Sequence, residues 1–427
     1  MDFYFHNIRL IDPVEKIDDF FNVRIKDGIF AQISKSECDL DLETRKIDGI
    51  NLIMTPGFID IHVHLREPGQ EHKETIKTGT ASAANGGFTG VVCMPNTKPD
   101  IDNVEVIDYI NSKSRDLLVD VFISAGITKG RKGDQLTDMN ELSEAGVLLF
   151  TDDGAPVSNS NVMKQAFEYA AYKDLILSQH CEDTELTGNF VMNESELSTT
   201  LGLEGYPRIA EEIILFRDIR MADYYGNRKY HAQHLSTIGA IDLVRYAKSN
   251  NQRVSCEVTP HHFVLTEENM RQYNADYKMN PPLRQQIDVD GIIEGIKDGT
   301  VDCIATDHAP HSEVEKNNEL QKAPNGIIGL ETALGLSMTY LVHAGHISVN
   351  RMIEMLTNNP REILGIAQPK IKTGEIANVT IFNPDEEWTV DKKKFKSKSS
   401  NSPFEGFKLK GKPVMSINKN QYFECDL

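Results

Sequence analysis

Cysteine is scarce in this chain, and no two cysteines share the spacing of a metal-binding or redox pair. Six cysteines are spread over 427 residues, and none falls in a Cys-x-x-Cys pattern. This excludes the common thiolate zinc motifs and gives no sign of a disulfide framework. Scattered cysteines are typical of reduced thiols, so we expect a cytoplasmic protein.

Long apolar runs and a basic charge balance are also missing. No apolar run approaches the roughly 20 residues that span a membrane, and the opening residues Met1–Phe5 do not resemble a secretory signal. The 64 acidic residues outnumber the 45 basic ones, for a net charge of −19. This balance disfavours nucleic acid or an anionic membrane as a partner. An anionic small-molecule substrate would need a strong local positive centre.

The middle of the chain alternates short apolar runs with helix-like segments. The eight runs are Gly57–His62, Gly87–Met94, Val119–Ala125, Val147–Thr151, Leu175–His180, Lys229–Leu235, Arg253–Val258 and Val301–Thr306. Buried parallel strands read as nearly continuous apolar runs, and this alternation is typical of βα units. We therefore predict an α/β protein whose residues 55–365 form a (β/α)₈ TIM-like barrel.

Both ends of the chain read instead as short β segments with turns. Phe3–Ile11, Phe21–Ile25 and Gly28–Ile33 partly alternate apolar and polar residues, and Ile371–Val390 looks similar. We expect residues 1–54 and 366–427 to build one composite small β-domain. The basic, serine-rich segment Lys392–Ser402 is expected to be a solvated surface loop.

The first predicted barrel strand ends in His62-Val63-His64-Leu65-Arg66. Alternate side chains of a strand share a face, so His62 and His64 point the same way, as two metal ligands must. Arg66 follows on that face, where it could bind an anion. A half-buried strand that carries histidine for structural reasons would show the same spacing. The residues at the other strand ends are therefore needed to tell a metal site from a structural strand.

Seven of the eight predicted strands end in His, Asp or Asn, and in a barrel these ends meet at one mouth. The candidate ligands are His62, His64, Asp153, His180, His234 and Asp307. Six ligands exceed one tetrahedral site and suit two metals bridged by a carboxylate such as Asp153, with a hydroxide as the second bridge. For other polar residues nearby we favour structural or supporting roles, namely Asp152, His231, His261 and His262.

The motifs around these residues resemble the amidohydrolase superfamily and, within it, the type I dihydroorotases. The resemblance covers nearly the whole chain. Its motifs are His62–Gly69, Met94–Thr97, Thr259–His262, Met279–Arg284, Ala305–His311 and Asn401–Gly406.

This resemblance implies two zinc ions per subunit. His62, His64 and Asp307 would hold one, His180 and His234 the other, with Asp153 and a hydroxide bridging them. Many relatives bridge with a carboxylated lysine after the fourth strand, but Phe150–Asp153 contains no lysine, so the chain resembles the branch that uses aspartate. Asp307 would also be the catalytic residue that moves the proton.

The resemblance further implies the reversible cyclisation of N-carbamoyl-L-aspartate to (S)-dihydroorotate, with loss of water, in de novo pyrimidine (UMP) biosynthesis. The residues that match substrate contacts of the family are His64, Arg66, Asn96, Asn280 and His311, with Asn325 and Gly326 contributing mainly backbone. One departure is Pro324-Asn325-Gly326, where relatives often carry Phe before Gly.

Two alternatives remain at this point. One is another cyclic amidase, such as an allantoinase or a dihydropyrimidinase, but Arg66 and Asn96 argue against a substrate with a neutral ring. The other is an inactive homologue that supports aspartate transcarbamoylase, but all six ligand candidates are present here. We also expect a homodimer that could associate with aspartate transcarbamoylase.

Overall fold

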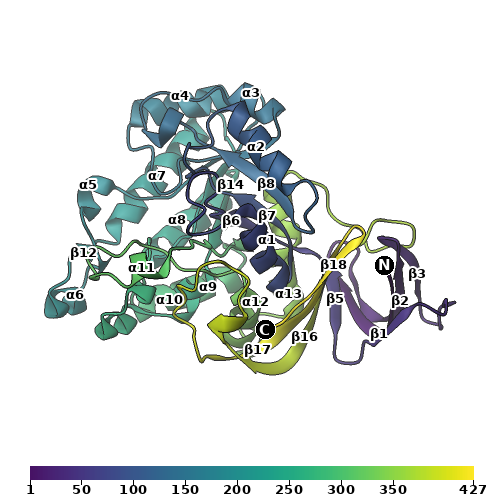
Figure 1. Ribbon diagram of the computed structural model, residues 1–427. Helices are drawn as coiled ribbons and strands as arrows, with labels where there is room; N and C mark the ends of the chain where they lie inside the picture. Colours follow the sequence, from purple (N-terminus) through teal and green to yellow (C-terminus); the bar gives the residue numbers. More distant parts are fainter.

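The computed structural model describes residues 1–427 and contains a parallel eight-stranded barrel (Figure 1). Its strands are β6 (Phe58–Val63), β7 (Phe88–Cys93), β8 (Asp120–Ala125), β9 (Val147–Phe150), β10 (Leu177–Gln179), β13 (Tyr230–Ala232), β14 (Val254–Val258) and β15 (Cys303–Ile304). Neighbouring strands pair in parallel in this order. The ring closes beyond β15, where the His64 N–H donates to the His308 carbonyl at 2.8 Å. The predicted barrel and all eight of its strands are confirmed.

Helices follow the strands and pack on the outside of the barrel. They are α1 (Ile76–Asn85), α2 (Val104–Ser114), α3 (Met139–Glu144), α4 (Ser160–Ala170), α7 (Ile209–Tyr224), α8 (Ile238–Ser249), α10 (Gln286–Lys297) and α13 (Val349–Leu356). Polar side chains cap most of them: Thr75 begins α1 and Thr237 begins α8, and each accepts a first-turn backbone N–H. In α4 the buried residues Val162, Ala166 and Ala170 recur every fourth position, which puts an apolar stripe against the sheet.

Smaller elements fill the connections near the barrel mouth and below it. The short helices are α5 (Thr184–Thr187), α6 (Glu196–Leu201), α9 (Pro260–Val264), α11 (Glu313–Lys316), α12 (Ala333–Ser337) and α14 (Asn358–Leu364). Two short strands, β11 (Met192–Asn193) and β12 (Gly205–Tyr206), pair in parallel. The 3₁₀-helices are η1 (Lys129–Arg131), η2 (Glu267–Gln272), η3 (Ala275–Tyr277) and η5 (Lys392–Lys394), and η4 (Met338–Val342) is a π-helix. No helix is both long enough and apolar enough to span a membrane.

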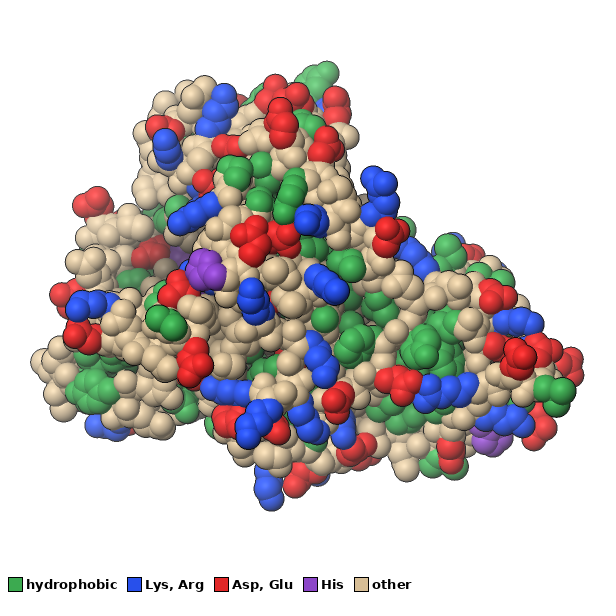
Figure 2. Space-filling model, viewed as in Figure 1, with side chains coloured by type: hydrophobic (Ala, Val, Ile, Leu, Met, Phe, Trp, Pro, Cys, Tyr) green, Lys and Arg blue, Asp and Glu red, His purple; other side chains and the backbone are tan.

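A second sheet joins the two ends of the chain. Its strands are β1 (Asp2–Asp12), β2 (Ile17–Lys26), β3 (Ile29–Ser34), β4 (Arg45–Asp48), β5 (Ile53–Pro56), β16 (Asn378–Thr389), β17 (Lys408–Asn418) and β18 (Gln421–Glu424). Figure 1 shows the purple and yellow strands side by side, because β16 pairs with β5. The expected mixing of both chain ends is present, whereas the domain limits 1–54, 55–365 and 366–427 stay a prediction. On the face of the molecule shown in Figure 2, the side chains of Lys and Arg are mixed with those of Asp and Glu.

The segment Lys392–Ser402 is not the solvated surface loop that we expected. Ser399, Asn401 and Ser402 are buried, and the Lys398 backbone N–H donates to Glu74 at 3.0 Å. Its lysine side chains reach solvent, but its backbone and hydroxyl groups satisfy buried carboxylates on the barrel. Composition alone could not predict this, because lysine and serine content indicates exposed side chains and carries no information about the hydrogen bonds of the backbone.

Candidate active site

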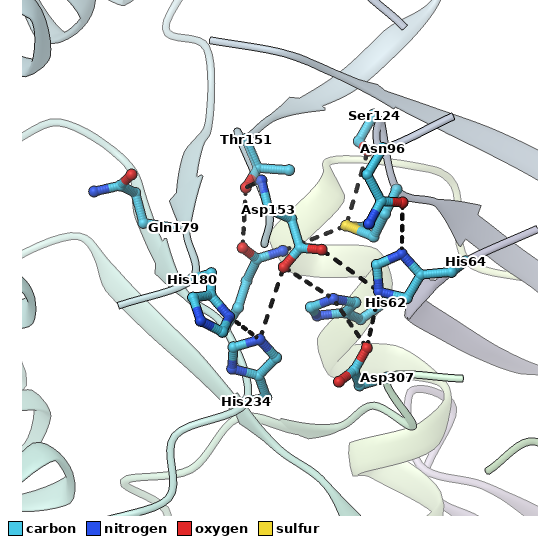
Figure 3. Close-up of polar contacts among 12 residues, drawn as sticks. His62, His64, Asn96, Ser124, Thr151, Asp153, Gln179, His180, His234 and Asp307 are labelled. Carbon is cyan, nitrogen blue, oxygen red and sulfur yellow. Dashed lines mark hydrogen bonds and ion pairs between the residues drawn. The ribbon is translucent and has the colours of Figure 1, made fainter. Parts of the chain in front are cut away.

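Asp153 lies at the centre of a histidine cluster at the barrel mouth (Figure 3). Its Oδ1 is 3.4 Å from His62 Nε2 and 3.7 Å from His234 Nε2, and its Oδ2 is 3.5 Å from His64 Nε2. His62 lies on β6, and His64, Asp153 and His234 follow β6, β9 and β13 respectively. The parallel barrel therefore brings together residues that are distant in the sequence, as the strand ends predicted.

Two overlapping groups in this cluster could each hold a metal ion. In one, the ligand atoms of His62, His64 and Asp153 lie within 4.8 Å of one another. Asp307 adjoins this group, with its Oδ1 2.9 Å from His64 Nε2 and 3.6 Å from His62 Nε2.

The second group consists of Asp153, His180 and His234. His180 Nδ1 lies 2.9 Å from His234 Nε2, while His180 Nε2 donates to the Glu182 carboxylate at 2.9 Å. That bond puts the lone pair of His180 on Nδ1, which faces a second imidazole nitrogen. A cation shared by the two nitrogens would satisfy both.

The histidine orientations fit metal ligation. His62 Nδ1 donates to Glu257 at 2.5 Å, and His64 Nδ1 donates to the Asn96 side-chain oxygen at 2.8 Å. In the His62 ring the lone pair then lies on Nε2, facing the cluster, and His64 Nε2 faces Asp307 Oδ1 at 2.9 Å. His62 Nε2 is buried and has no hydrogen-bond partner. Metal-ligating histidines are typically held in this way by a carboxylate or an amide behind the ring.

Electrostatics at the cluster favour positive charge beside the carboxylates. Burial opposes a charged His62, but Asp153 and Glu257 outweigh it and raise the pKa of His62 well above its usual value. Burial likewise raises the pKa of Asp153, yet His62 and His234 outweigh this and hold that pKa well below the usual range. The field that would retain a proton on His62 also favours a bound cation.

Backbone strain coincides with the site. Arg66, His234 and Asp307 have φ values of +62°, +32° and +47°. Side-chain-bearing residues rarely adopt this region, and such strain concentrates at functional sites where the surroundings enforce it. Here the barrel rim fixes three candidate functional side chains in this way.

An anion-binding end adjoins the histidine cluster. Arg66 is 7% exposed, donates its Nε–H to the Pro310 carbonyl at 3.2 Å and forms no ion pair. Burial lowers the pKa of Arg66 to about 10, which still leaves it charged at neutral pH. Burial and the Arg66 charge lower the pKa of His311 to about 2, so His311 is neutral and donates Nε2–H to the Asn325 carbonyl at 2.9 Å. A buried guanidinium without a carboxylate is a ready partner for an anion.

These groups surround one cavity of about 220 Å³. Its lining is His64, Arg66, Asn96, Asp153, Gly154, His180, His234, Asn280, Asp307, Ala309, His311, Asn325 and Gly326. The structure thus places all seven predicted substrate contacts and five of the six predicted metal ligands around a single space. The sixth ligand, His62, lies beneath the lining and is fully buried.

Some supporting residues escaped the sequence analysis. Glu257 joins His62 to His231, whose Nε2 lies 3.1 Å from the other Glu257 oxygen, and the structural role expected for His231 stays a prediction. Glu182 supports His180. Both carboxylates lie at the ends of predicted strands, and that position was the only available signal.

No contact was assigned to the Asn401 side chain from the sequence, because its partners lie 75 to 92 residues away in the sequence. Its side chain donates to the carbonyls of Ala309 and Gly326 at 3.1 and 3.0 Å and accepts the His311 backbone N–H at 3.1 Å. Of the remaining polar residues, Asp152 accepts the Thr128 N–H at 2.9 Å, as expected for a supporting group.

A parallel (β/α)₈ barrel with overlapping His and Asp groups at its mouth defines a metal-dependent hydrolase architecture. Solved structures agree on the fold. An L-hydantoinase (dihydropyrimidinase) from Arthrobacter aurescens superposes with a TM-score of 0.88 at 23% identity, over 99% of this chain and 96% of its own. A D-hydantoinase (dihydropyrimidinase) from Thermus sp. gives 0.83 at 22% identity, over 99% and 95%.

Sequence relatives identify the family. A dihydroorotase of Acetivibrio thermocellus is 46% identical over 94% of both chains, and one of Citrifermentans bemidjiense is 46% identical over 97% of both. Residues 51–239 also match the family model described as dihydro-orotase-like. The chain belongs to the dihydroorotase family.

Proposed function

We propose that this site interconverts N-carbamoyl-L-aspartate and (S)-dihydroorotate, with water released on cyclisation, as a step of pyrimidine biosynthesis. The observation that carries the proposal is Arg66, a buried guanidinium without a carboxylate partner, in the same cavity as the histidine cluster. A ring substrate with a carboxylate needs both features, whereas a neutral ring needs only the cluster.

We propose two zinc ions as the cofactor. His62, His64 and Asp307 would hold one, His180 and His234 the other, and Asp153 would contact both. Imidazole and carboxylate donors suit zinc, and the unpartnered His62 Nε2 supports a ligand at that point. When bound, such a pair supplies Lewis acidity and makes water nucleophilic at neutral pH.

Other side chains of the cavity transfer the proton and bind the substrate. Asp307 takes a proton from the attacking water and passes it to the ring nitrogen that leaves. Arg66 binds the substrate carboxylate through two N–H groups. Asn96 already accepts from His64, so its NH₂ group is free to donate to the substrate.

Asn280 presents the opposite polarity. Its NH₂ group donates to Glu182 at 2.8 Å, and its side-chain oxygen is buried without a hydrogen-bond partner. That oxygen can accept an N–H of the substrate ring. The cavity thus offers a cationic fork, a donor and an acceptor around one small molecule.

The test is hydrolysis of dihydroorotate by the purified protein, with dihydrouracil and hydantoin as neutral-ring comparators. We expect turnover of dihydroorotate to exceed that of both comparators, and about two zinc ions per chain by elemental analysis. Equal rates on all three rings would reduce the assignment to an unspecified cyclic amidase. A homodimer, a contact with aspartate transcarbamoylase and a cytoplasmic location remain predictions, and light scattering tests the first.

A further inference from the structure

Two lysines beside the cavity are buried without a carboxylate partner, and the reaction proposed above does not use them. Lys278 is 4% exposed and Lys316 is 5% exposed. Asp276, the carboxylate whose charge acts on Lys316, forms its own ion pair with Lys392 at 2.9 Å. Burying an ammonium group is costly unless every N–H is hydrogen-bonded.

Both ammonium groups use all three of their N–H donors on backbone carbonyls. Lys278 Nζ donates to Leu320, Gln321 and Ala323 at 2.9, 3.2 and 2.8 Å. Lys316 Nζ donates to Lys278, Pro324 and Gly326 at 3.3, 3.1 and 3.0 Å. Five of the six carbonyls belong to one loop, residues 317–326.

This loop has no regular secondary structure of its own but ends at the cavity. Asn325 and Gly326 line the cavity, and the Asn325 carbonyl accepts from His311. The Gly326 N–H donates to the same Lys278 carbonyl that Lys316 contacts, at 3.0 Å. The two lysines therefore tie the loop to the segments that carry Asn280 and His311.

We propose that Lys278 and Lys316 are positioning residues that clamp the loop 317–326 in the conformation that binds substrate. Neither touches the substrate. The clamp replaces the hydrogen bonds that a loop normally makes to water, so the loop stays ordered while its carbonyls are buried. The statement about substrate rests on the function proposed above, whereas the statement about loop order does not.

The first measurement compares Lys316→Met with Lys322→Met in steady-state hydrolysis of dihydroorotate. Methionine keeps the length of the buried side chain but removes all three donors. The Pro324 carbonyl then has no donor, whereas the Lys278 carbonyl keeps the Gly326 N–H and the Gly326 carbonyl keeps the Asn401 side chain. We expect KM to rise at least about tenfold with kcat within about threefold, since the loop binds but does not react. Lys322 is the matched control, because it lies in the same loop, is exposed and pairs only with Glu319 at 2.8 Å. Its variant should keep the wild-type KM.

The second measurement is limited trypsin cleavage after Lys322, which requires the loop to open. Cleavage should be faster in Lys316→Met and in Lys278→Met than in the wild type, and dihydroorotate should slow it. If Lys316→Met does not fold, Lys316→Gln, which keeps two N–H donors on a shorter side chain, and Lys278→Met provide the same comparison.

The clamp would be overturned if the Lys316 and Lys278 variants kept the wild-type KM and the wild-type rate of trypsin cleavage. It would also be overturned if these variants lost kcat alone, or if Lys322→Met raised KM as much as Lys316→Met does. If the wild type does not hydrolyse dihydroorotate, the proposed function fails. The cleavage rates without ligand then still decide whether the lysines order the loop.

Discussion

His62 and Glu257 face each other across the barrel interior, with Nδ1 and Oε1 2.5 Å apart. Both side chains are buried, and Glu257 also contacts His231. The pair orients the His62 ring so that Nε2 points at Asp153.

Replacing Glu257 by glutamine should weaken metal binding without removing a ligand. The amide still accepts from His62 but no longer supplies the charge that makes the ring a strong donor. Loss of such a supporting group typically lowers metal affinity by about 10- to 100-fold. Zinc content after dialysis against graded chelator measures this.

Asp152→Asn is the control for that change. Asp152 is a buried carboxylate at the same rim, but it bonds to Thr128 rather than to an imidazole. Its variant should retain zinc as the wild type does. Equal zinc retention by Glu257→Gln and the wild type would show that Glu257 does not support the metal.

A bridging aspartate predicts activity that is independent of bicarbonate. Enzymes that use a carboxylated lysine need carbon dioxide to rebuild their bridge, whereas Phe150–Asp153 contains no lysine. Apoprotein reconstituted with zinc in degassed buffer should reach the same kcat with and without bicarbonate. Rescue of Asp153→Ala by bicarbonate would contradict Asp153 as the bridge.

Asp307→Asn should abolish most turnover while the cavity stays formed. Asparagine can still contact His64 but cannot take up the proton of the attacking water. We expect kcat to fall at least about 100-fold, the lower range for a positioned acid–base group. Zinc analysis of the same sample separates lost chemistry from lost metal, and a variant with full zinc and near-normal kcat would rule out this role.

The barrel and the histidine cluster were readable from the sequence because both depend on local patterns. Apolar runs mark buried strands, and candidate metal ligands such as His62 and His180 come at the points where those runs end. The parallel barrel then brings the strand ends together without further information.

The supporting contacts were not readable because they depend on partners remote in the chain. Asn401 reaches Gly326 and Lys278 reaches Ala323 through carbonyl groups, which every residue has and no sequence pattern marks. The segment 392–402 was misread for the same reason, since its backbone rather than its lysines makes the contact.

Gly326 should tolerate no side chain. Its φ is +126°, and a Cβ would lie 2.8 Å from Ala309 Cβ and 3.3 Å from His311 Nε2. Gly326→Ala should therefore raise the KM for dihydroorotate by about tenfold or more and destabilise the fold by about 1–3 kcal/mol.

Gly299→Ala is the matched control, because its φ is +83° but nothing lies within 4 Å of the added Cβ. It should lower the melting temperature without changing KM. If both variants change KM alike, the effect comes from general destabilisation and not from the cavity.

Arg66 should determine which ring the enzyme prefers. Dihydroorotate carries a carboxylate that dihydrouracil lacks, and Arg66 is buried beside the cavity without another anion. A bidentate charge-assisted pair in such a pocket is worth about 2–4 kcal/mol, or roughly 30- to 1,000-fold in kcat/KM. The wild type should prefer dihydroorotate by at least that factor.

Arg66→Met should erase most of this preference by weakening only the substrate that carries the carboxylate. Arg66→Lys should recover part of it, because lysine keeps the charge but loses the planar fork. Dihydrouracil serves as the internal control, since its kcat/KM should stay within about threefold across the series if the metal ligands are undisturbed. An unchanged preference in Arg66→Met would place the carboxylate at another group, and the strained backbone of Arg66, with its φ of +62°, would then need a different explanation.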